Sequence, residues 1–255
     1  MLRPRIIPCL LIREKGLVKT QQFKNEKYVG DPINAIRIFN EKKCDELMVL
    51  DIDSSSKNYG INLSQVEKYA AECRMPLCYG GGIKSVEQAK SIISLGVEKI
   101  ALSAAAIDNP KLVADLALEI GSQSVVVVLD VKKNVFGRYN VFTHNGTKKS
   151  HSDVIALAKT MQEQGAGEIV INSIDNDGML SGYDLTLAKR LKKEMSIPLT
   201  ILGGAGSYND LKDLVSACGI IGVSAGSLFV FKGVYRAVLI NYPDLKQKDM
   251  VISLD

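Results

Sequence analysis

Asp130 is the residue whose position most clearly predicts chemistry, because it follows an unbroken apolar run at residues 125–129. Such a run is typical of a strand buried on both faces, and the carboxylate would emerge at the C-terminal tip of that strand. In parallel α/β barrels this tip is where reactions take place, and a desolvated carboxylate there can act as a general acid or base. Asp51 ends a second apolar run, and Lys19 lies in the long connection after the first. Taken singly, Asp51 and Asp130 would more often cap loops than catalyse.

Two clusters of glycines predict anion-binding turns. Each cluster follows an apolar run, precedes a helical pattern and is paired with a turn of small residues after the next run. Glycine lets backbone N–H groups approach an anion closely, and the following helix adds its dipole. The clusters therefore predict two phosphate sites and a substrate with a phosphate at both ends, although tight turns with close helix packing explain the same glycines. The residues are Gly81 and Gly82 with Ser103 and Ala104, and Gly203 and Gly204 with Gly226 and Ser227.

Polar residues outside these clusters leave alternatives open. The turn Asp177-Gly178 either offers backbone donors to an anion or is simply a turn. Four charged residues stand at the starts of predicted strands, where inward-facing side chains would meet at the N-terminal mouth of a barrel and neutralise one another. From spacing alone, a salt-bridged plug that closes the core explains them better than any function. They are Arg5, Glu46, Lys99 and Glu168.

Composition argues against several other chemistries. The 255-residue chain carries 32 basic and 28 acidic residues without a Lys/Arg-dense stripe, so we expect no nucleic-acid partner. The two histidines lack metal-ligand spacing and the glycines lack a dinucleotide fingerprint, so we expect neither a metal nor a cofactor. Five cysteines without a CxxC motif indicate reduced thiols in a cytoplasmic protein. The apolar run near residue 1 is too short for a signal peptide or a membrane span.

The elements that must position these residues alternate between short apolar runs and longer amphipathic stretches, as in repeated βα units. Eight of each predict an α/β fold, a (β/α)8 TIM barrel, and since no linker divides the chain we expect a single domain over residues 1–255. Strands are predicted at 5–11, 46–51, 76–79, 99–103, 124–130, 168–173, 198–202 and 220–224. Helices are predicted at 32–43, 63–74, 85–95, 109–120, 152–165, 184–195, 207–217 and 230–240.

An internal repeat predicts two half-barrels, at about residues 1–120 and 121–240. The segment YGGGIKSVEQA of the first half aligns with LGGAGSYNDLK of the second, and DELMVLDID aligns with GEIVINSID. Variants of one four-strand unit thus make up both halves. Under the same pairing Leu11 falls on Asp130, so the symmetry identifies Leu11 as the place where a second acid is missing.

Two connections are longer than the usual range of about four to six residues. Residues 12–31 are rich in Lys, Gln and Asn and follow the first strand, which predicts a mobile flap over the barrel. Residues 132–150 have the alternation and turn residues of a small hairpin. Both connections would overhang the C-terminal face.

Several segments together resemble the cyclase subunit of imidazole glycerol phosphate synthase, the HisF-type barrel of histidine biosynthesis. The similarity runs from residue 1 to about residue 240. It implies a glutaminase (HisH-type) partner on the N-terminal face and ammonia that passes through the barrel to a bisphosphorylated substrate. That family converts phosphoribulosyl-formimino-aminoimidazole-carboxamide ribonucleotide to imidazole glycerol phosphate and aminoimidazole carboxamide ribonucleotide. The segments are RIIPCL, DPINAIRIFNEKKCDELMVLDID, YGGGIKSVEQA, GSQSVVVVLDVKK, FTHNGTKK, GAGEIVINSIDNDGMLSGYD and LGGAG.

Carried over position by position, the resemblance implies roles for most of the residues singled out above. Two positions depart from the family: Leu11 stands where it has a catalytic Asp, and Ser103-Ala104 stands where an Asn-Thr pair helps to hold one phosphate. Catalytic roles are implied for Lys19, Asp51 and Asp130; phosphate or substrate binding for Gly82, Gly204, Asp177-Gly178 and Gly226-Ser227; and an ammonia gate for Arg5, Glu46, Lys99 and Glu168.

Four functional hypotheses follow. The first is a synthase subunit of histidine biosynthesis. The second is a paralogue that passes glutamine-derived ammonia to a sugar amidotransferase in bacterial surface-sugar biosynthesis, because Leu11 cannot transfer a proton; Arg13, Glu14 or Lys15 are alternative sources of the missing group. The third is a non-catalytic conduit that activates a glutaminase. The fourth, a sugar-phosphate isomerase, would need an acid at position 11 and gives no reason for a charged gate.

Overall fold

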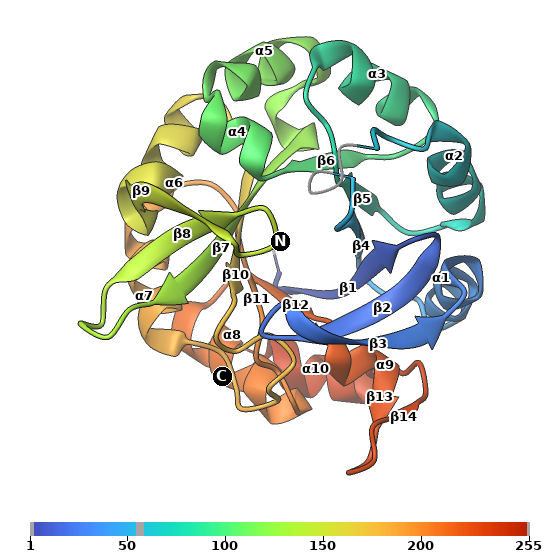
Figure 1. Cartoon of the computed structure of the whole chain (residues 1–255). Coiled ribbons are helices and arrows are strands. Elements are labelled where there is room, and N and C mark those ends of the chain that lie inside the picture. Colours follow the sequence, from blue (N-terminus) through green and yellow to red (C-terminus); the bar gives the residue numbers. More distant parts are fainter. Residues whose placement is uncertain (1–2, 55–58, 254–255) are drawn as a thin grey trace.

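Eight parallel strands close into a barrel in the computed structural model, which describes residues 3–54 and 59–253 (Figure 1). Each strand pairs with the next around the barrel, and β7 pairs with β10 to join the two halves of the chain. The predicted (β/α)8 barrel is therefore confirmed, with strand bounds that differ from the prediction by at most three residues. In order around the barrel the strands are β1 (Arg5–Arg13), β4 (Leu47–Asp51), β5 (Leu77–Gly80), β6 (Lys99–Leu102), β7 (Val125–Lys133), β10 (Glu168–Ser173), β11 (Leu199–Leu202) and β12 (Gly222–Ala225).

Helices surround the barrel, and most of the long ones begin at a side-chain cap that the sequence makes visible. The residue before the helix is Asp, Asn or Ser, and its side chain accepts a backbone N–H of the first turn. Seven of the eight predicted helices are confirmed, because the structure has a helix at each of these predicted positions. They are α1 (Pro32–Glu41), α2 (Leu63–Glu72), α3 (Val86–Ser94), α5 (Lys111–Ile120), α6 (Val154–Glu163), α7 (Leu185–Glu194) and α8 (Tyr208–Cys218).

The eighth predicted helix, at residues 230–240, is wrong. The chain there leaves the short helix α9 (Ser227–Val230) and forms a hairpin of β13 (Phe231–Lys232) and β14 (Ala237–Val238). Gly233 has φ 72°, and its carbonyl accepts the N–H of Arg236 to close the turn. The β-branched and aromatic residues of this stretch favour strands, so its apolar residues belong to the two-residue period of a strand and not to the 3.6-residue period of a helix. The helix of this unit comes later, as α10 (Leu245–Ile252).

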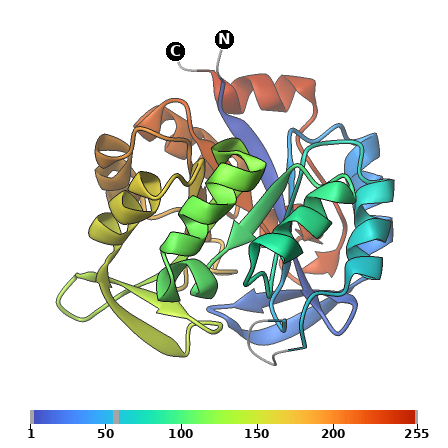
Figure 2. The same ribbon diagram turned by 90° about the horizontal axis from the view of Figure 1, so that it is seen from above.

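The long connections are antiparallel extensions of the sheet. Within residues 12–31, where a mobile flap over the barrel was predicted, β1 continues to Arg13 and pairs with β2 (Gly16–Gln21), which pairs with β3 (Lys24–Gly30). The hairpin predicted after the fifth barrel strand is confirmed as β8 (Tyr139–Thr143) and β9 (Lys148–Asp153), with β8 paired to β7. Figure 2 shows both extensions at the end of the barrel opposite the two termini and α10. The short helix α4 (Ala104–Asp108), which follows β6, was not predicted.

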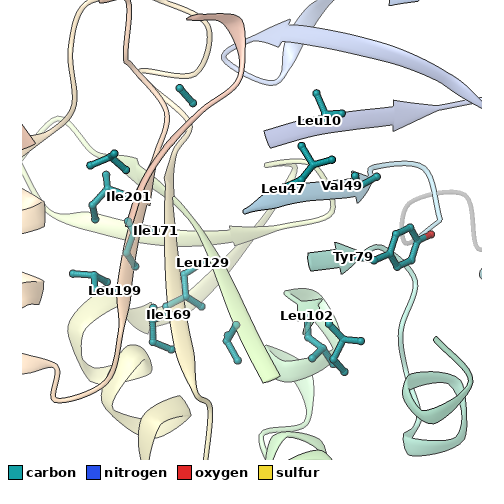
Figure 3. Packing of buried hydrophobic residues seen from close by; sticks show 14 of the residues in the cluster. Leu10, Leu47, Val49, Tyr79, Leu102, Leu129, Ile169, Ile171, Leu199 and Ile201 are labelled. Atoms are coloured by element: carbon teal, nitrogen blue, oxygen red, sulfur yellow. The ribbon is translucent and has the colours of Figure 1, made fainter. Parts of the chain in front are cut away.

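Side chains of the barrel strands alternate between two apolar layers. Those that point outward pack under the helices in the large core, and Figure 3 shows this layer with Leu10, Leu129 and Ile171 among its members. Those that point inward fill the barrel with a second cluster. The inner cluster consists of Ile7, Cys9, Met48, Cys78, Ala101, Val126, Val128, Val170 and Leu202, with Leu11 and Leu50 packed against it. In the described part of the chain, no helix is long and apolar enough to cross a membrane.

The outer layer carries much of the stability of the barrel. Leu129→Ala removes a side chain with no exposed surface and should lower the free energy of unfolding by about 2–5 kcal/mol, since the cavity left behind fills only partly. Leu118→Ala, at a position 85% exposed on α5, is the control and should change stability by less than about 0.5 kcal/mol. Urea denaturation followed by circular dichroism measures both, and equal effects would contradict the packing described here.

Candidate active site

A cavity of about 460 Å³ opens at the C-terminal ends of the barrel strands, below the two antiparallel extensions. Its walls come from almost every barrel strand and from the loops that follow them, as expected when parallel strands end at one rim. All the residues predicted to bind or convert a substrate line this one cavity. They are Leu11, Lys19, Asp51, Gly81, Gly82, Ser103, Ala104, Asp130, Asp177, Gly178, Gly203, Gly204, Gly226 and Ser227.

Asp130 is the titratable group best placed for proton transfer at neutral pH. It is a half-buried residue of β7, and its Oδ1 accepts a hydrogen bond of 2.9 Å from Nδ2 of Asn172 on β10. Burial raises the pKa of Asp130 to about 7; the hydrogen bond from Asn172 lowers it, and the nearby charge of Asp177 raises it. A carboxylate with a pKa close to the working pH can both take and give a proton.

Asn172 is a residue that the sequence analysis missed. It is 8% exposed and reaches Asp130 because the two residues are paired in the register of β10 and β7. Its Oδ1 has no hydrogen-bond partner within the described chain, so it remains available to a ligand. The only sequence signal was a polar residue in an otherwise apolar strand.

Lys19 is buried at 4% exposure on β2, which folds across the cavity. Its Nζ donates a hydrogen bond to the backbone carbonyl of Cys9, and a Cβ placed on Gly226 would lie 2.5 Å from the same nitrogen. Burial lowers the pKa of Lys19, while the charges of Cys9 and Asp177 oppose that change. A glycine at position 226 therefore lets the ammonium group reach the turn of the second glycine cluster.

Asp51 caps the loop that follows β4. Its Oδ1 accepts the backbone N–H groups of Asp53 and Ser54, both at 3.0 Å. A Cβ on Gly81 would lie 2.4 Å from the carbonyl oxygen of Asp51, so only glycine fits where β4 and the next loop meet. The loop-capping alternative thus describes what Asp51 does in the structure.

Asp177 attaches the β2–β3 extension to the loop after β10. Its Oδ2 accepts hydrogen bonds from Oγ1 of Thr20 at 2.6 Å and from the backbone N–H of Phe23 at 3.2 Å. Gly178 lets the two segments touch, because a Cβ there would lie 2.2 Å from the carbonyl oxygen of Thr20. These contacts hold Lys19 over the cavity, so Asp177-Gly178 organises the site in addition to lining it.

The first glycine cluster forms a polar corner of the cavity. Gly81 and Gly82 have φ of 123° and 74°, in the left-handed region that favours glycine. Oγ of Ser103 is buried and makes no hydrogen bond to any described residue. An unpaired buried hydroxyl is costly, so Ser103 is ready to bind a polar ligand. Ala104 offers only its backbone.

The second glycine cluster is crowded by neighbouring backbone. A Cβ on Gly204 would lie 2.1 Å from the carbonyl oxygen of Gly182, and one on Gly203 would lie 2.7 Å from that of Ser173. Close packing of the backbone therefore explains why some of these residues are glycine, which agrees with the alternative interpretation of tight, closely packed turns. The same residues line the cavity beside Gly226 and Ser227.

Leu11 lies at the rim with an alkyl side chain, at the position where the half-barrel symmetry predicts a second acidic residue opposite Asp130. It pairs with Leu50 on β4 and packs on the apolar cluster inside the barrel. Of the three alternative proton donors nearby, Glu14 and Lys15 are exposed in the turn between β1 and β2 and do not line the cavity. Arg13 does line it, but its guanidinium pairs with Asp53 and Glu26.

The four charged residues at the strand starts form a closed ring at the other end of the barrel. Nη2 of Arg5 lies 2.8 Å from Oε1 of Glu168, and Nη1 of Arg5 bonds Glu46. Nζ of Lys99 lies 2.8 Å from Glu46 and 3.0 Å from Glu168. Thr200 adds a hydrogen bond of 2.6 Å to Glu168.

The opposite charges in this ring stabilise one another in their ionised forms. Burial alone would lower the pKa of Lys99, but Glu168 and Glu46 raise it above its usual value. Burial would likewise raise the pKa of Glu168, but Arg5 and Lys99 lower it overall. Both partners are thus held in their ionic forms. The arrangement is the salt-bridged ring that the spacing predicts, and its geometry alone assigns no transport role.

The fold and the cavity define a class, the (β/α)8-barrel enzymes, here with a carboxylate of raised pKa and polar loops at the C-terminal rim. Among the described residues, no group of three His, Cys, Asp or Glu side chains is placed to hold a metal ion. Residues 5–236 match the family model described as "Histidine biosynthesis protein". The chain belongs to this family, among its HisF-type subunits.

Similar proteins fall into two groups by identity. A Vibrio vulnificus protein, provisionally named imidazole glycerol phosphate synthase subunit hisF3, is 55% identical over 100% of this chain and 98% of its own length. A Leptospira borgpetersenii protein with the provisional name imidazole glycerol phosphate synthase subunit HisF is 56% identical over 98% of both chains. The imidazole glycerol phosphate synthase subunit HisF of Alkaliphilus metalliredigens is 38% identical over 100% of this chain and 99% of its own length.

The raised pKa of Asp130 predicts how stability depends on pH. Its pKa of about 7 in the folded chain exceeds the unfolded value of about 3.9, so the folded state binds the extra proton between those values. The stability from this group is complete below about pH 4 and is lost as the pH rises through 7, a decline of the order of 4 kcal/mol. Asp130→Asn should flatten that decline in urea denaturation at pH 5 and pH 8. The exposed Asp115→Asn is the control, and an unchanged pH profile for Asp130→Asn would contradict the assignment.

The charged ring predicts a large cost when one partner is removed. Lys99→Met leaves Glu46 and Glu168 to share Arg5, so one buried negative charge loses its cation, which typically costs about 3–5 kcal/mol of folding free energy. Lys90→Met is the matched control, because it breaks an exposed pair with Glu119 and should cost less than about 1 kcal/mol. Thermal unfolding of both variants measures the difference, and comparable melting temperatures would show that the ring does not hold the barrel together.

Proposed function

We propose that this chain is the ammonia-using barrel subunit of a glutamine-dependent synthase of the imidazole glycerol phosphate synthase type. The observation that carries the proposal is the charged ring at one end of the barrel combined with Asp130 in a cavity at the other end. The names of the related proteins support it, since each is given as a subunit of that synthase. The partner in this proposal is a glutaminase docked on the N-terminal face, around the ring.

The interior between ring and cavity suits ammonia rather than ammonium. Its side chains are uncharged, with Ile7, Met48, Ala101 and Val170 among them. An isolated cation would lose its hydration there at a high cost, whereas neutral ammonia would lose little. Ammonia released at the ring would thus reach the cavity as the nucleophile, without a proton to be removed first.

The substrate in this proposal carries a phosphate at each end, one at each glycine cluster. The unpaired hydroxyl of Ser103 and the ammonium group of Lys19 beside Gly226 support this placement. The reacting carbon would then lie between the two clusters, over Asp130. When ammonia forms a bond to a carbonyl carbon, its nitrogen becomes cationic, and Asp130 is placed to take the proton that it must lose.

Leu11 favours a second candidate function. Loss of the carbonyl oxygen as water requires an acid, and an alkyl side chain cannot supply it. The second candidate is a paralogue that passes glutamine-derived ammonia to a sugar amidotransferase in surface-sugar biosynthesis. Ala104, which has no side-chain hydrogen-bonding group at the first glycine cluster, also favours it. The chain is more similar to the provisionally named relatives, at 55–56%, than to the synthase subunit at 38%.

Leu11→Asp tests which candidate is correct. With ammonium salt and phosphoribulosyl-formimino-aminoimidazole-carboxamide ribonucleotide, the variant should turn over about 10²–10⁴-fold faster than the natural chain, as expected for restored acid catalysis. Leu50→Asp is the matched control, because it puts a carboxylate on the strand next to Leu11 in the same cavity, and it should bring no gain. Absorbance of the released carboxamide ribonucleotide measures the rate. Absence of turnover in both the natural chain and Leu11→Asp would refute the synthase and favour the paralogue.

A further inference from the structure

Arg236 lies at the end of the turn that joins β13 to β14, in the hairpin that takes the place of the predicted eighth helix (Figure 1). We propose that Arg236 is a phosphate ligand at the second glycine cluster, where its guanidinium and Ser227 together bind one terminal phosphate monoester of the substrate. This inference rests on the proposed function, because it assigns a further residue to one of the two phosphate sites.

The position of the guanidinium is the first support. Its Nη2 lies 3.3 Å from Oγ of Ser227, a residue of the cavity wall. Its Nε is buried, and nothing in the described chain accepts a hydrogen bond from it. A buried guanidinium nitrogen without an acceptor is costly, so this donor would gain from an acceptor on a ligand. Arg236 does not itself line the cavity in the described structure, and it would meet such a ligand next to Ser227.

The guanidinium is also held in a fixed orientation. It stacks on the ring of Phe231, with 4.8 Å between its central carbon and the ring centroid. Nζ of Lys27, on β3, donates a hydrogen bond of 2.8 Å to the backbone carbonyl of Arg236 and lies 5.2 Å from the centroid of the same ring. The hairpin is thereby attached to the β2–β3 extension, which covers the cavity. A donor fixed before binding loses less entropy when it binds.

A second cation is close to the same turn. Nζ of Lys19 lies so close to Gly226 that a side chain at position 226 would displace it. Burial raises the pKa of Asp177, and the positive charges of Lys19 and Arg236 both oppose that rise, so the two cations lie near one carboxylate. Two cations and a hydroxyl around one turn match a phosphate dianion, for which the planar guanidinium offers paired N–H donors.

The backbone at Arg236 favours a role for its side chain. Its φ of 49° lies in the left-handed region, where glycine or asparagine is more stable than arginine. Arginine at the last position of this turn therefore costs conformational energy. A functional contact of the side chain accounts for that strain.

Phosphate binding by Arg236→Gln tests the inference. The probe is inorganic phosphate, titrated into the full-length protein and followed by ³¹P NMR line broadening. The tighter phosphate-binding event should weaken about tenfold or more, as expected when a charge-assisted hydrogen bond is lost. Arg236→Lys should lose less, because it keeps the charge without the planar fork. Tyr235→Ala is the control on the same turn, 95% exposed, and should bind phosphate like the natural chain.

The outcomes separate this inference from the proposed function. If the natural chain and Arg236→Gln bind phosphate equally well, Arg236 is not a ligand, while the phosphate sites and the proposed function stand. If the natural chain binds no phosphate, both fail. Should Arg236→Gln not fold, Arg236→Gly replaces it, since glycine accepts the positive φ, and it should also show the tenfold loss.

Discussion

Closure of the barrel by the pairing of β7 with β10 is the constraint on which the rest of the structure depends. In a closed sheet with alternating side chains, the residues at the strand starts must meet at one end and those at the strand tips at the other. The pairing puts Asn172 beside Asp130 and brings Glu168 within reach of Arg5 and Lys99. The ring and the cavity are thus two ends of one arrangement, and the inward-facing apolar layer between them separates a fully neutralised charge cluster from a carboxylate whose pKa is raised by burial.

The antiparallel extensions turn an open barrel rim into a site. Asp177 receives the hydrogen bonds of Thr20 and Phe23, and this contact keeps Lys19 buried over the cavity. The β13–β14 hairpin is attached to the same extension through Lys27. Charged side chains that would be solvated on a free loop are therefore held at the rim by hydrogen bonds that involve side chains of both segments. The energy of burying them is offset by carboxylates and carbonyls of the chain itself, which also sets their orientation for an anion.

Sequence reasoning reached most of the fold and part of the site. Apolar runs, caps and the internal repeat located the barrel strands and most helices, because burial and capping are local requirements of each element. The helix prediction for residues 230–240 failed, because the apolar spacing there is compatible with either a helix or a strand and only Gly233 marks the turn. The strands within residues 12–31 were not predicted, because extension of β1 past the rim depends on pairing with β2, which no local pattern required. Asn172 was missed because its contact with Asp130 joins residues 42 positions apart in sequence. Arg236 was missed because its contact with Ser227, nine positions away, depends on the β13–β14 hairpin, which was not predicted.

The sequence by itself determined the barrel architecture, the gathering of the two glycine clusters and Asp130 at one rim, and the vacancy at Leu11, because strand periodicity and an internal repeat are properties of the chain's order. Only the tertiary structure decided what each group experiences there. The pKa of Asp130 depends on how completely water is excluded around it, and the ionic state of Lys99 on two carboxylates from other strands. The position of Arg236 depends on a hairpin that stacks against Phe231. Desolvation and Coulomb energy depend on distances in space, and residues far apart in sequence set those distances only after the barrel has closed.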